Sequence, residues 1–132
     1  MSRSNLEALR ALYKEWAAGS FMGLAELVAP DVFFFSEVPE GQVECRGPQE
    51  LGRFFVEFLR QWDAYRIEAN DFVELGNDAV LVGGRQYGSV SSSGAATEAA
   101  IFILWTFRGE EVVSMHCSFD RSRALRAAGL GD

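Results

Sequence analysis

The chain has 132 residues, 48% of them hydrophobic, which favours one domain over residues 1–132 with a sizeable core. A net charge of −7 opposes nucleic-acid binding, and no apolar run has the length of a membrane span or a signal peptide. We therefore expect a cytoplasmic protein without nucleic-acid or membrane partners. Cys45 and Cys117 lack the spacing of a disulfide framework or a metal site, so no metal or cofactor is expected.

Residues 5–18 are predicted to form an amphipathic helix, because apolar side chains recur there every three or four positions. Gly19 is expected to end this helix, since glycine readily adopts the left-handed conformation found at helix C-termini. Ser20 is expected to cap a second, short helix that runs through Val28. The apolar stripe of the first helix consists of Leu6, Leu9, Leu12, Tyr13 and Trp16.

A β-favouring run at residues 32–35 predicts the first strand. Residues 36–46 contain a proline, a glycine and several acids, and are predicted to form an exposed loop that lies over the first strand as a lid. Pro48 then begins the clearest helix of the chain, with Glu50 placed to favour its N-terminus. The stripe of this helix consists of Leu51, Phe54, Phe55, Phe58, Leu59 and Trp62.

The rest of the chain is predicted to form a four-stranded antiparallel meander. Its first two strands are residues 65–75 and 79–90, joined by a turn at residues 76–78. The pair Gly83-Gly84 in the second strand predicts a bulge or a sharp bend, because glycine weakens a strand interior unless the backbone needs it. A strongly curved sheet follows from that bend.

A long hairpin completes the meander. Its strands, residues 99–108 and 112–119, are joined by Gly109-Glu110, a two-residue loop that suits a type II′ turn because glycine accepts a positive φ. A closing helix is predicted at residues 121–128.

The short loop determines which side chains of the hairpin share a face, because residues equidistant from it lie opposite each other. One predicted face is almost wholly apolar and is expected to pack against helices; it holds Ala100, Phe102, Leu104, Thr106, Val113, Met115, Cys117 and Phe119. The other face mixes apolar and polar groups, as a ligand cavity or a subunit interface would; it holds Ala99, Ile101, Ile103, Trp105, Phe107, Val112, Ser114, His116, Ser118 and Asp120.

The order of the predicted elements is that of an α+β protein. With its Tyr13/Trp16 helix, RGPQEL at 46–51, WTFRG at 105–109 and FDRSRALRAAGL from Phe119, the chain resembles the NTF2-like superfamily and its SnoaL-like, polyketide cyclase-like family. The resemblance implies a cone of helices packed on a strongly curved, mostly antiparallel sheet, a pocket at its mouth, and a homodimer. That fold serves isomerases, cyclases, dehydratases, epoxide hydrolases and members without a known reaction, so it does not set the function.

Asp120 and His116 are the candidate catalytic residues. Asp120 ends the last strand, where the resemblance implies an acid in catalytic members, but it is also well placed to cap the following helix, and we favour the cap. His116, the only histidine, titrates near neutral pH and is a candidate proton carrier; the favoured alternative is a structural or interface role. A regular strand separates the two by about 13 Å, which excludes a direct dyad. For Asp71, a bulge that turns it outward is favoured over a catalytic role.

The candidate ligand-binding residues lie on several predicted elements. Arg85 and Tyr87 share a face after the glycine pair, where a guanidinium would hold an enolate or carboxylate and a phenol would donate to a carbonyl. Solvent exposure is the favoured alternative for Arg85. Apolar pocket walls are expected from Tyr13, Trp16, Phe34, Phe58 and Ile103, for which core packing is the alternative.

Two functional hypotheses follow. The first is a pocket for an apolar, aromatic or polycyclic small molecule, in an isomerase, cyclase or hydrolase that acts by proton transfer. The second is a non-catalytic ligand-binding or dimerisation module of the same fold. They differ in whether Asp120 and His116 reach a common void of about 300 Å³ or more.

Overall fold

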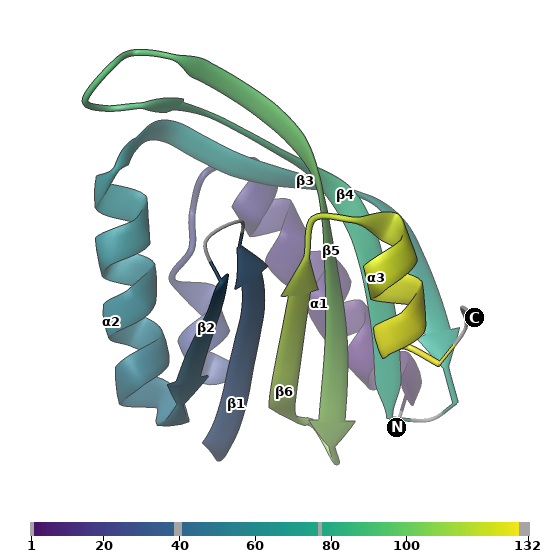
Figure 1. Cartoon of the computed structure of the whole chain (residues 1–132). Helices are drawn as coiled ribbons and strands as arrows, with labels where there is room; N and C mark the ends of the chain where they lie inside the picture. The colour runs from purple at the N-terminus through teal and green to yellow at the C-terminus, as the bar shows by residue number, and fades with distance from the viewer. Residues whose placement is uncertain (1, 39–40, 77, 130–132) are drawn as a thin grey trace.

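The computed structural model describes residues 2–38, 41–76 and 78–129. Within these residues, a helix, a short 3₁₀ turn, two paired strands and a second helix precede the long meander (Figure 1). The elements in chain order are α1 (Ser2–Ala17), the 3₁₀ helix η1 (Gly23–Glu26), β1 (Val28–Val38), β2 (Gly41–Arg46), α2 (Gly47–Arg60), β3 (Trp62–Leu75), β4 (Ala79–Val90), β5 (Ala96–Arg108), β6 (Glu111–Ser118) and α3 (Arg121–Ala127).

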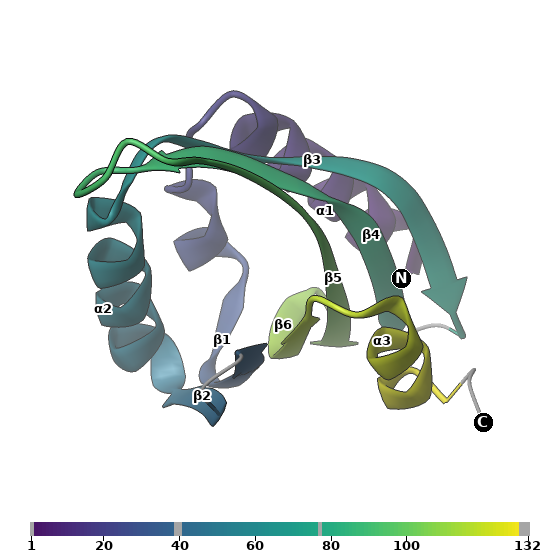
Figure 2. The same ribbon diagram turned by 45° about the horizontal axis from the view of Figure 1, so that its top comes forward.

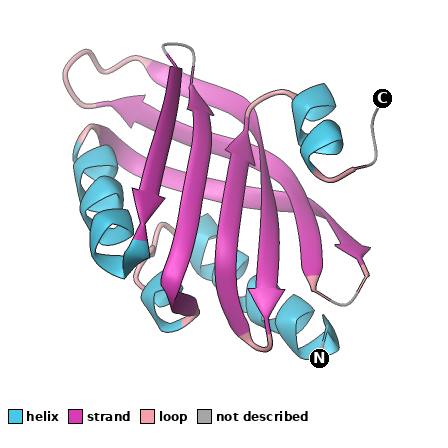
Figure 3. Cartoon of the chain, turned by 60° about the horizontal axis from the view of Figure 1, so that its bottom comes forward, coloured by secondary structure: helices cyan, strands magenta, loops and turns pink. Residues whose placement is uncertain are grey.

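The described strands form one sheet in the order β2-β1-β6-β5-β4-β3. β1 and β6 run parallel and all other neighbours antiparallel, which confirms the predicted α+β class. α1 and α2 cover one face, called here the inner face, and α3 lies on the opposite, outer face (Figure 3). β3, β4 and β5 bend strongly along their length (Figure 2), so the sheet is curved as expected.

The end of α1 confirms the predicted role of Gly19, which has a φ of +88° and donates its N–H to Trp16. The predicted helix from Ser20 through Val28 is wrong, because only the single turn η1 forms there and Val28 already belongs to β1. Val28 pairs with Val112 of β6, so sheet pairing overrides the helical pattern at this point.

The predicted loop at residues 36–46 is also wrong. β1 continues to Val38, and β2 pairs antiparallel with it from Phe33↔Arg46 to Val38↔Gly41. Pro39 and Glu40, which belonged to the expected lid, lie outside the described residues. The exposed acids misled the prediction, because an edge strand carries charged side chains on its solvent side while its alternate residues pack inward.

α2 begins as the sequence predicts, with proline in its first turn and the Glu50 side chain at its N-terminus. Glu50 Oε1 accepts a hydrogen bond from the backbone N–H of Arg46, the N-cap residue, at 2.8 Å. The aromatic stripe of α2, Phe54, Phe55 and Phe58, packs against the core on the inner face of the sheet.

A bulge accompanies the glycine pair of β4, but its extra residue lies in the neighbouring strand β3 and not in β4, where it was predicted. Ala69 pairs with Gly84 and Asp71 pairs with Gly83, so Asn70 is the extra residue. A Cβ at position 84 would clash with the backbone of Glu68, which explains the need for glycine there. The bulge also leaves the Asp71 side chain exposed, as expected. Asn77 of the predicted turn at residues 76–78 lies outside the described residues.

The β5–β6 hairpin has the predicted two-residue loop, with Arg108 opposite Glu111 and Phe107 opposite Val112. The register then shifts, because Thr106 pairs with Ser114 and leaves Val113 as a bulge. Beyond this bulge every β6 side chain lies on the face opposite to the predicted one.

The inner face of the hairpin therefore combines one half of each predicted face. It carries Ile101, Ile103, Trp105 and Phe107 of β5 beside Val112, Met115 and Cys117 of β6, all of which belong to the core. The outer face carries Phe102 and Leu104 beside Ser114 and His116. The predicted grouping of His116 with Ile103 is wrong.

Two hydrogen bonds, one partly buried and one buried, tie the hairpin to α1. Asn5, which is 3% exposed, donates its side-chain amide to the carbonyl of Gly109 at 3.0 Å. The indole of Trp105 donates to the hydroxyl of Tyr13, also at 3.0 Å. α1 is thereby held across the inner face, where it forms one wall of the hollow described next.

Candidate functional site

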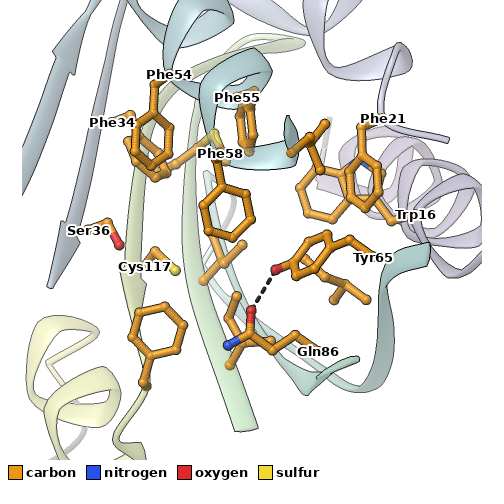
Figure 4. A pocket seen from close by; sticks show the side chains of 16 residues that line it. Trp16, Phe21, Phe34, Ser36, Phe54, Phe55, Phe58, Tyr65, Gln86 and Cys117 are labelled. Carbon is orange, nitrogen blue, oxygen red and sulfur yellow. Dashed lines mark hydrogen bonds between the residues drawn. The ribbon is translucent and has the colours of Figure 1, made fainter. Parts of the chain in front are cut away.

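An apolar hollow of about 50 Å³ lies between the inner face of the sheet, α1 and α2 (Figure 4). We call it the inner cavity. Aromatic rings supply half of its lining, from Trp16, Phe21, Phe34, Phe54, Phe55, Phe58, Tyr65 and Phe119. Aliphatic and sulfur-containing side chains complete the apolar wall, namely Leu59, Ile67, Ile101, Ile103, Met115 and Cys117. Ser36 and Gln86 add the remaining polar groups.

A larger hollow of about 510 Å³ adjoins the inner cavity, and we call it the vestibule. Phe58, Gln86 and Phe119 line both spaces, so the two meet across these three side chains. The outer wall of the vestibule carries charged groups, from Glu37, Asp120 and Arg123. A second surface hollow of about 460 Å³ lies between η1 and α2 and adjoins the inner cavity across Phe21, Phe55 and Leu59.

The ionisable groups that line the inner cavity are neutral near pH 7. Burial raises the pKa of Cys117 to about 12, and a hydrogen bond between this thiol and Ser36 offsets part of the rise. Burial likewise raises the pKa of the Tyr65 phenol. Because the thiolate is the nucleophilic form of cysteine, Cys117 is not an activated nucleophile.

Two polar side chains meet where the inner cavity joins the vestibule. The Tyr65 hydroxyl donates to Gln86 Oε1 at 2.5 Å (Figure 4). This bond orients the amide and leaves Gln86 Nε2 without a hydrogen-bond partner in the described part of the chain. Gln86 therefore offers N–H donors to a molecule at this junction.

Glu37 organises the charges of the vestibule. Its Oε2 accepts from His116 Nε2 at 3.0 Å, and its Oε1 accepts from Arg123 Nη1 at 2.7 Å. The bond from His116, with that from Arg123, holds the pKa of the Glu37 carboxyl below its usual value, although desolvation acts in the opposite direction. Glu37 is therefore a paired, weakly basic carboxylate.

Four predicted pocket residues, Trp16, Phe34, Phe58 and Ile103, line the inner cavity together. Tyr13 lies behind them in the core, 4% exposed, where its ring packs on Trp16 with centroids 4.9 Å apart. The Tyr13 hydroxyl accepts a hydrogen bond from the indole of Trp105, so Tyr13 supports the cavity wall from behind.

The structure does not bring Arg85 and Tyr87 to either space. Arg85 Nε donates to Glu98 at 2.9 Å on the exposed surface, which is the alternative that the sequence favoured. The guanidinium of Arg66 lies 4.3 Å from the ring centroid of Tyr87. Gln86, between them in sequence, points to the opposite face and is the β4 residue that reaches the cavity.

His116 and Asp120 do not share a void. His116 lies on the outer face, where its ring packs edge-on against Phe35 with centroids 4.8 Å apart, and it lines neither the inner cavity nor the vestibule. Asp120 is the N-cap of α3, since its Oδ1 accepts from the Ser122 backbone N–H at 2.8 Å, and it also borders the vestibule.

Sequence reasoning missed several residues of this site, among them Ser36, Glu37, Tyr65, Gln86 and Arg123. For the first two, the parity of Val32 and Phe34, carried on by two residues, places Ser36 on the inner side and Glu37 on the outer side, although the wholly apolar run at 32–35 makes this a weak signal. No comparable signal marks Gln86, whose place depends on the bulge in the neighbouring strand.

The described ranges contain no cluster of three or more His, Cys, Asp or Glu side chains that could hold a metal ion. None of the described helices is long and apolar enough to cross a membrane.

Solved structures with low sequence identity share this fold. An NTF2-like protein of unknown function from Burkholderia pseudomallei is 21% identical, with a TM-score of 0.74 over 93% of this chain and 95% of that chain. A Jannaschia sp. CCS1 protein described as a SnoaL-like polyketide cyclase is 16% identical, with a TM-score of 0.77 over 99% and 94%. TerC, co-crystallised with polyporic acid, is 21% identical, with a TM-score of 0.73 over 96% and 98%. Identities this low show the fold alone.

No curated protein sequence matches the chain. The family model of the SnoaL-like domain matches residues 9–115, a stretch that runs from α1 into β6 and includes most of the lining of the inner cavity. By this match, the chain belongs to the SnoaL-like domain family.

Proposed function

We propose that this SnoaL-like protein binds a largely apolar, aromatic small molecule that enters through the vestibule and places its leading end in the inner cavity. The observation that carries the proposal is the ring of aromatic side chains around a space that adjoins a hollow of about 510 Å³. Ligand pockets typically have volumes of about 300–1,000 Å³ and are lined by apolar groups with few polar ones.

The neutrality of the inner cavity supports an uncharged leading end. A charged group placed there would lose its hydration, and the raised pKa values of Cys117 and Tyr65 leave it no ionised partner. A planar ring would instead contact aromatic faces and edges, as the lining residues already contact one another; Phe58 and Tyr65, for example, meet edge to face at 5.1 Å.

Naphthalene is a suitable probe, because it is flat, uncharged and apolar. For ten heavy atoms we expect a binding free energy of about −5 kcal/mol, or a Kd of roughly 0.1–0.3 mM, measurable by NMR titration. Ile103→Phe should weaken binding by at least about tenfold, because it adds a ring inside a hollow of only about 50 Å³.

Leu104→Phe is the matched control, since Leu104 is the next residue of β5 and points to the outer face. It should change the Kd less than about twofold, the effect expected away from the site. Circular dichroism and urea unfolding of both variants establish that each is folded. Equal naphthalene binding by the parent and folded Ile103→Phe would overturn the proposal.

A second candidate function is an isomerase, cyclase or hydrolase reaction on the same ligand, with Asp120 as the proton carrier. The place of Asp120 on the vestibule wall favours it. Its Oδ1 is already bonded to the Ser122 N–H, so only one carboxylate oxygen would be available to a substrate. Asp120→Asn retains an oxygen for the cap and should leave naphthalene binding unchanged, while abolishing turnover of any substrate found.

The outer face supports a separate role in dimerisation. Beside His116, the outer face carries three half-buried side chains, Phe33, Phe35 and Leu104. α3 covers a different part of the same face, formed by Leu81 and Phe102. A second copy of the chain would cover these rings. Phe35→Asp should then shift sedimentation from dimer to monomer, whereas a monomeric parent would contradict this role.

A further inference from the structure

The surface hollow of about 460 Å³ between η1 and α2, called here the η1–α2 groove, is more aliphatic than the inner cavity. None of the thirteen described residues that line it is ionisable, so a charged molecule would find no oppositely charged partner among them. Only two of them, Phe21 and Phe55, are aromatic, against half of the lining of the inner cavity. The others are Gly19, Ser20, Met22, Leu24, Ala25, Val28, Pro48, Leu51, Gly52, Val56 and Leu59.

The η1–α2 groove exposes apolar side chains to water. Met22 is 84% exposed and Val56 is 52% exposed, and together they are two of the three exposed large hydrophobic residues in the described part of the chain. Besides the stripe that packs against the core, α2 therefore turns a second apolar stripe, with Gly52, Val56 and Leu59, to the groove. Exposed apolar groups that gather in a hollow, rather than lie scattered, are typical of a binding surface.

Gly52 leaves room in the groove at a cost to α2. Glycine is the least favourable residue of a helix interior after proline. The φ of Gly52 is not positive, and a Cβ added there would meet no atom within 4 Å, so neither backbone conformation nor packing requires glycine. Pro48, Phe55 and Val56, its neighbours one turn away, all line the groove. A larger side chain at position 52 would therefore project over the groove.

The size of the groove fits a small molecule better than a second copy of the chain. A stable interface between proteins uses about 20–30 residues on each side, whereas thirteen line the groove. Its volume of about 460 Å³ lies within the range of about 300–1,000 Å³ typical of small-molecule pockets. Aliphatic walls, with the adaptable side chain of Met22 among them, suit a flexible chain rather than a planar ring.

We infer that the η1–α2 groove is a second binding site, which takes an unbranched aliphatic chain whose polar end stays in water. Phe21, Phe55 and Leu59 line both the groove and the inner cavity, so the two sites lie back to back. Because Met22 and Val56 are open to water, the chain reaches the groove directly and not through the inner cavity. The inference is therefore independent of the ligand proposed for the inner cavity.

1-Octanol is a suitable probe, because it is uncharged and unbranched and carries one polar end. Met22 lines the groove and Met115 lines the inner cavity, so their methyl resonances report on the two sites separately in protein labelled with ¹³C at the methionine methyls. We expect octanol to shift the Met22 resonance with a Kd of about 0.5–1 mM, and to leave that of Met115 nearly unchanged. From 1-butanol to 1-octanol, each added CH₂ should tighten binding about two- to fourfold.

Gly52→Phe should weaken octanol binding by at least about tenfold, because the added ring occupies the groove. Since glycine is unfavourable in a helix, the variant should unfold at a urea concentration no lower than the parent does. Arg53→Phe is the matched control, because Arg53 is the next residue of α2, is exposed and does not line the groove. Arg53→Phe, and Ile103→Phe in the inner cavity, should each change the Kd for octanol less than about twofold.

Equal octanol binding by the parent and folded Gly52→Phe would overturn the inference. So would an octanol titration that shifts Met115 in place of Met22 or shifts neither methyl, a result that needs no variant to fold. A Met22 shift that depends on protein concentration without octanol would show that a second copy occupies the groove, and would also overturn it. Naphthalene binding in the inner cavity is measured separately, so the proposed function and this inference fail independently.

Discussion

The inner cavity and the vestibule meet across Phe58, Gln86 and Phe119, yet they differ in chemistry. The inner cavity is lined mainly by aromatic and aliphatic side chains, and the ionisable groups in its wall are uncharged near pH 7. The vestibule is open and carries carboxylates that are already hydrogen-bonded. Affinity should therefore come from burial of an apolar ring in the inner cavity, while the charged groups of the vestibule serve mainly to hold β1, β6 and α3 together.

Thiol reactivity offers the largest contrast between the two spaces. Because the pKa of Cys117 is raised to about 12 from an ordinary value of 9.0, its thiolate fraction at pH 8 should be about 1,000-fold lower than that of a free thiol. Ala99→Cys places a comparison thiol on the vestibule wall. Iodoacetamide should alkylate the introduced thiol within minutes and Cys117 over days, as followed by peptide mass spectrometry. Equal rates in the folded protein would show that the inner cavity is open to water.

Truncating a side chain should lower the free energy of unfolding more in the inner cavity than at its junction with the vestibule. Met115→Ala removes a fully buried side chain from the inner cavity and should lower the free energy of unfolding by about 2–5 kcal/mol. Phe119→Ala truncates a ring that is 40% exposed at the junction and should cost about 1 kcal/mol. Urea unfolding measures both values. A larger loss of unfolding free energy for Phe119→Ala than for Met115→Ala would show that the core lies at the junction and not in the inner cavity.

The Glu37 cluster should make stability depend on pH. The folded pKa of Glu37 lies below its ordinary value of 4.5, so the ionised carboxylate stabilises the fold above that pH, and this contribution disappears as the pH falls through the folded pKa. Glu37→Gln should therefore lose about 1 kcal/mol at pH 7 and show a smaller decline in stability below about pH 4.5. Identical pH profiles for parent and variant would refute a structural role for the cluster.

The smallest expected effect is that of His116 on ligand binding. His116 lies on the outer face and reaches the vestibule only through Glu37. His116→Ala should leave the Kd for naphthalene within about twofold of the parent value in an NMR titration. A loss of tenfold or more would place His116 in the ligand site.

The fold was largely predictable because its signals are local. The helix stripes, the glycine at the end of α1, the capping Glu50 and the two-residue hairpin loop each specify backbone conformation within a few residues. The capping of α3 by Asp120 is likewise a local signal, because the bond joins residues two positions apart.

The site was less predictable because its geometry depends on pairing between strands. One extra residue at Val113 moves His116 to the outer face and places Met115 and Cys117 beside Ile103. A signal was present, since Ser114, His116 and Ser118 alternate with apolar residues in the phase of a strand whose polar side faces outward. The two adjacent valines at 112 and 113 mark where that phase changes.

We expect an apolar ring to bind where the inner cavity meets the vestibule. A crystal structure of the protein with 2-bromonaphthalene would show where the ligand lies, because the anomalous signal of bromine locates it. We predict a peak in the space bounded by Phe58, Gln86 and Phe119. A peak confined to the outer face beside Phe35 and His116, or no peak at a saturating concentration, would contradict it.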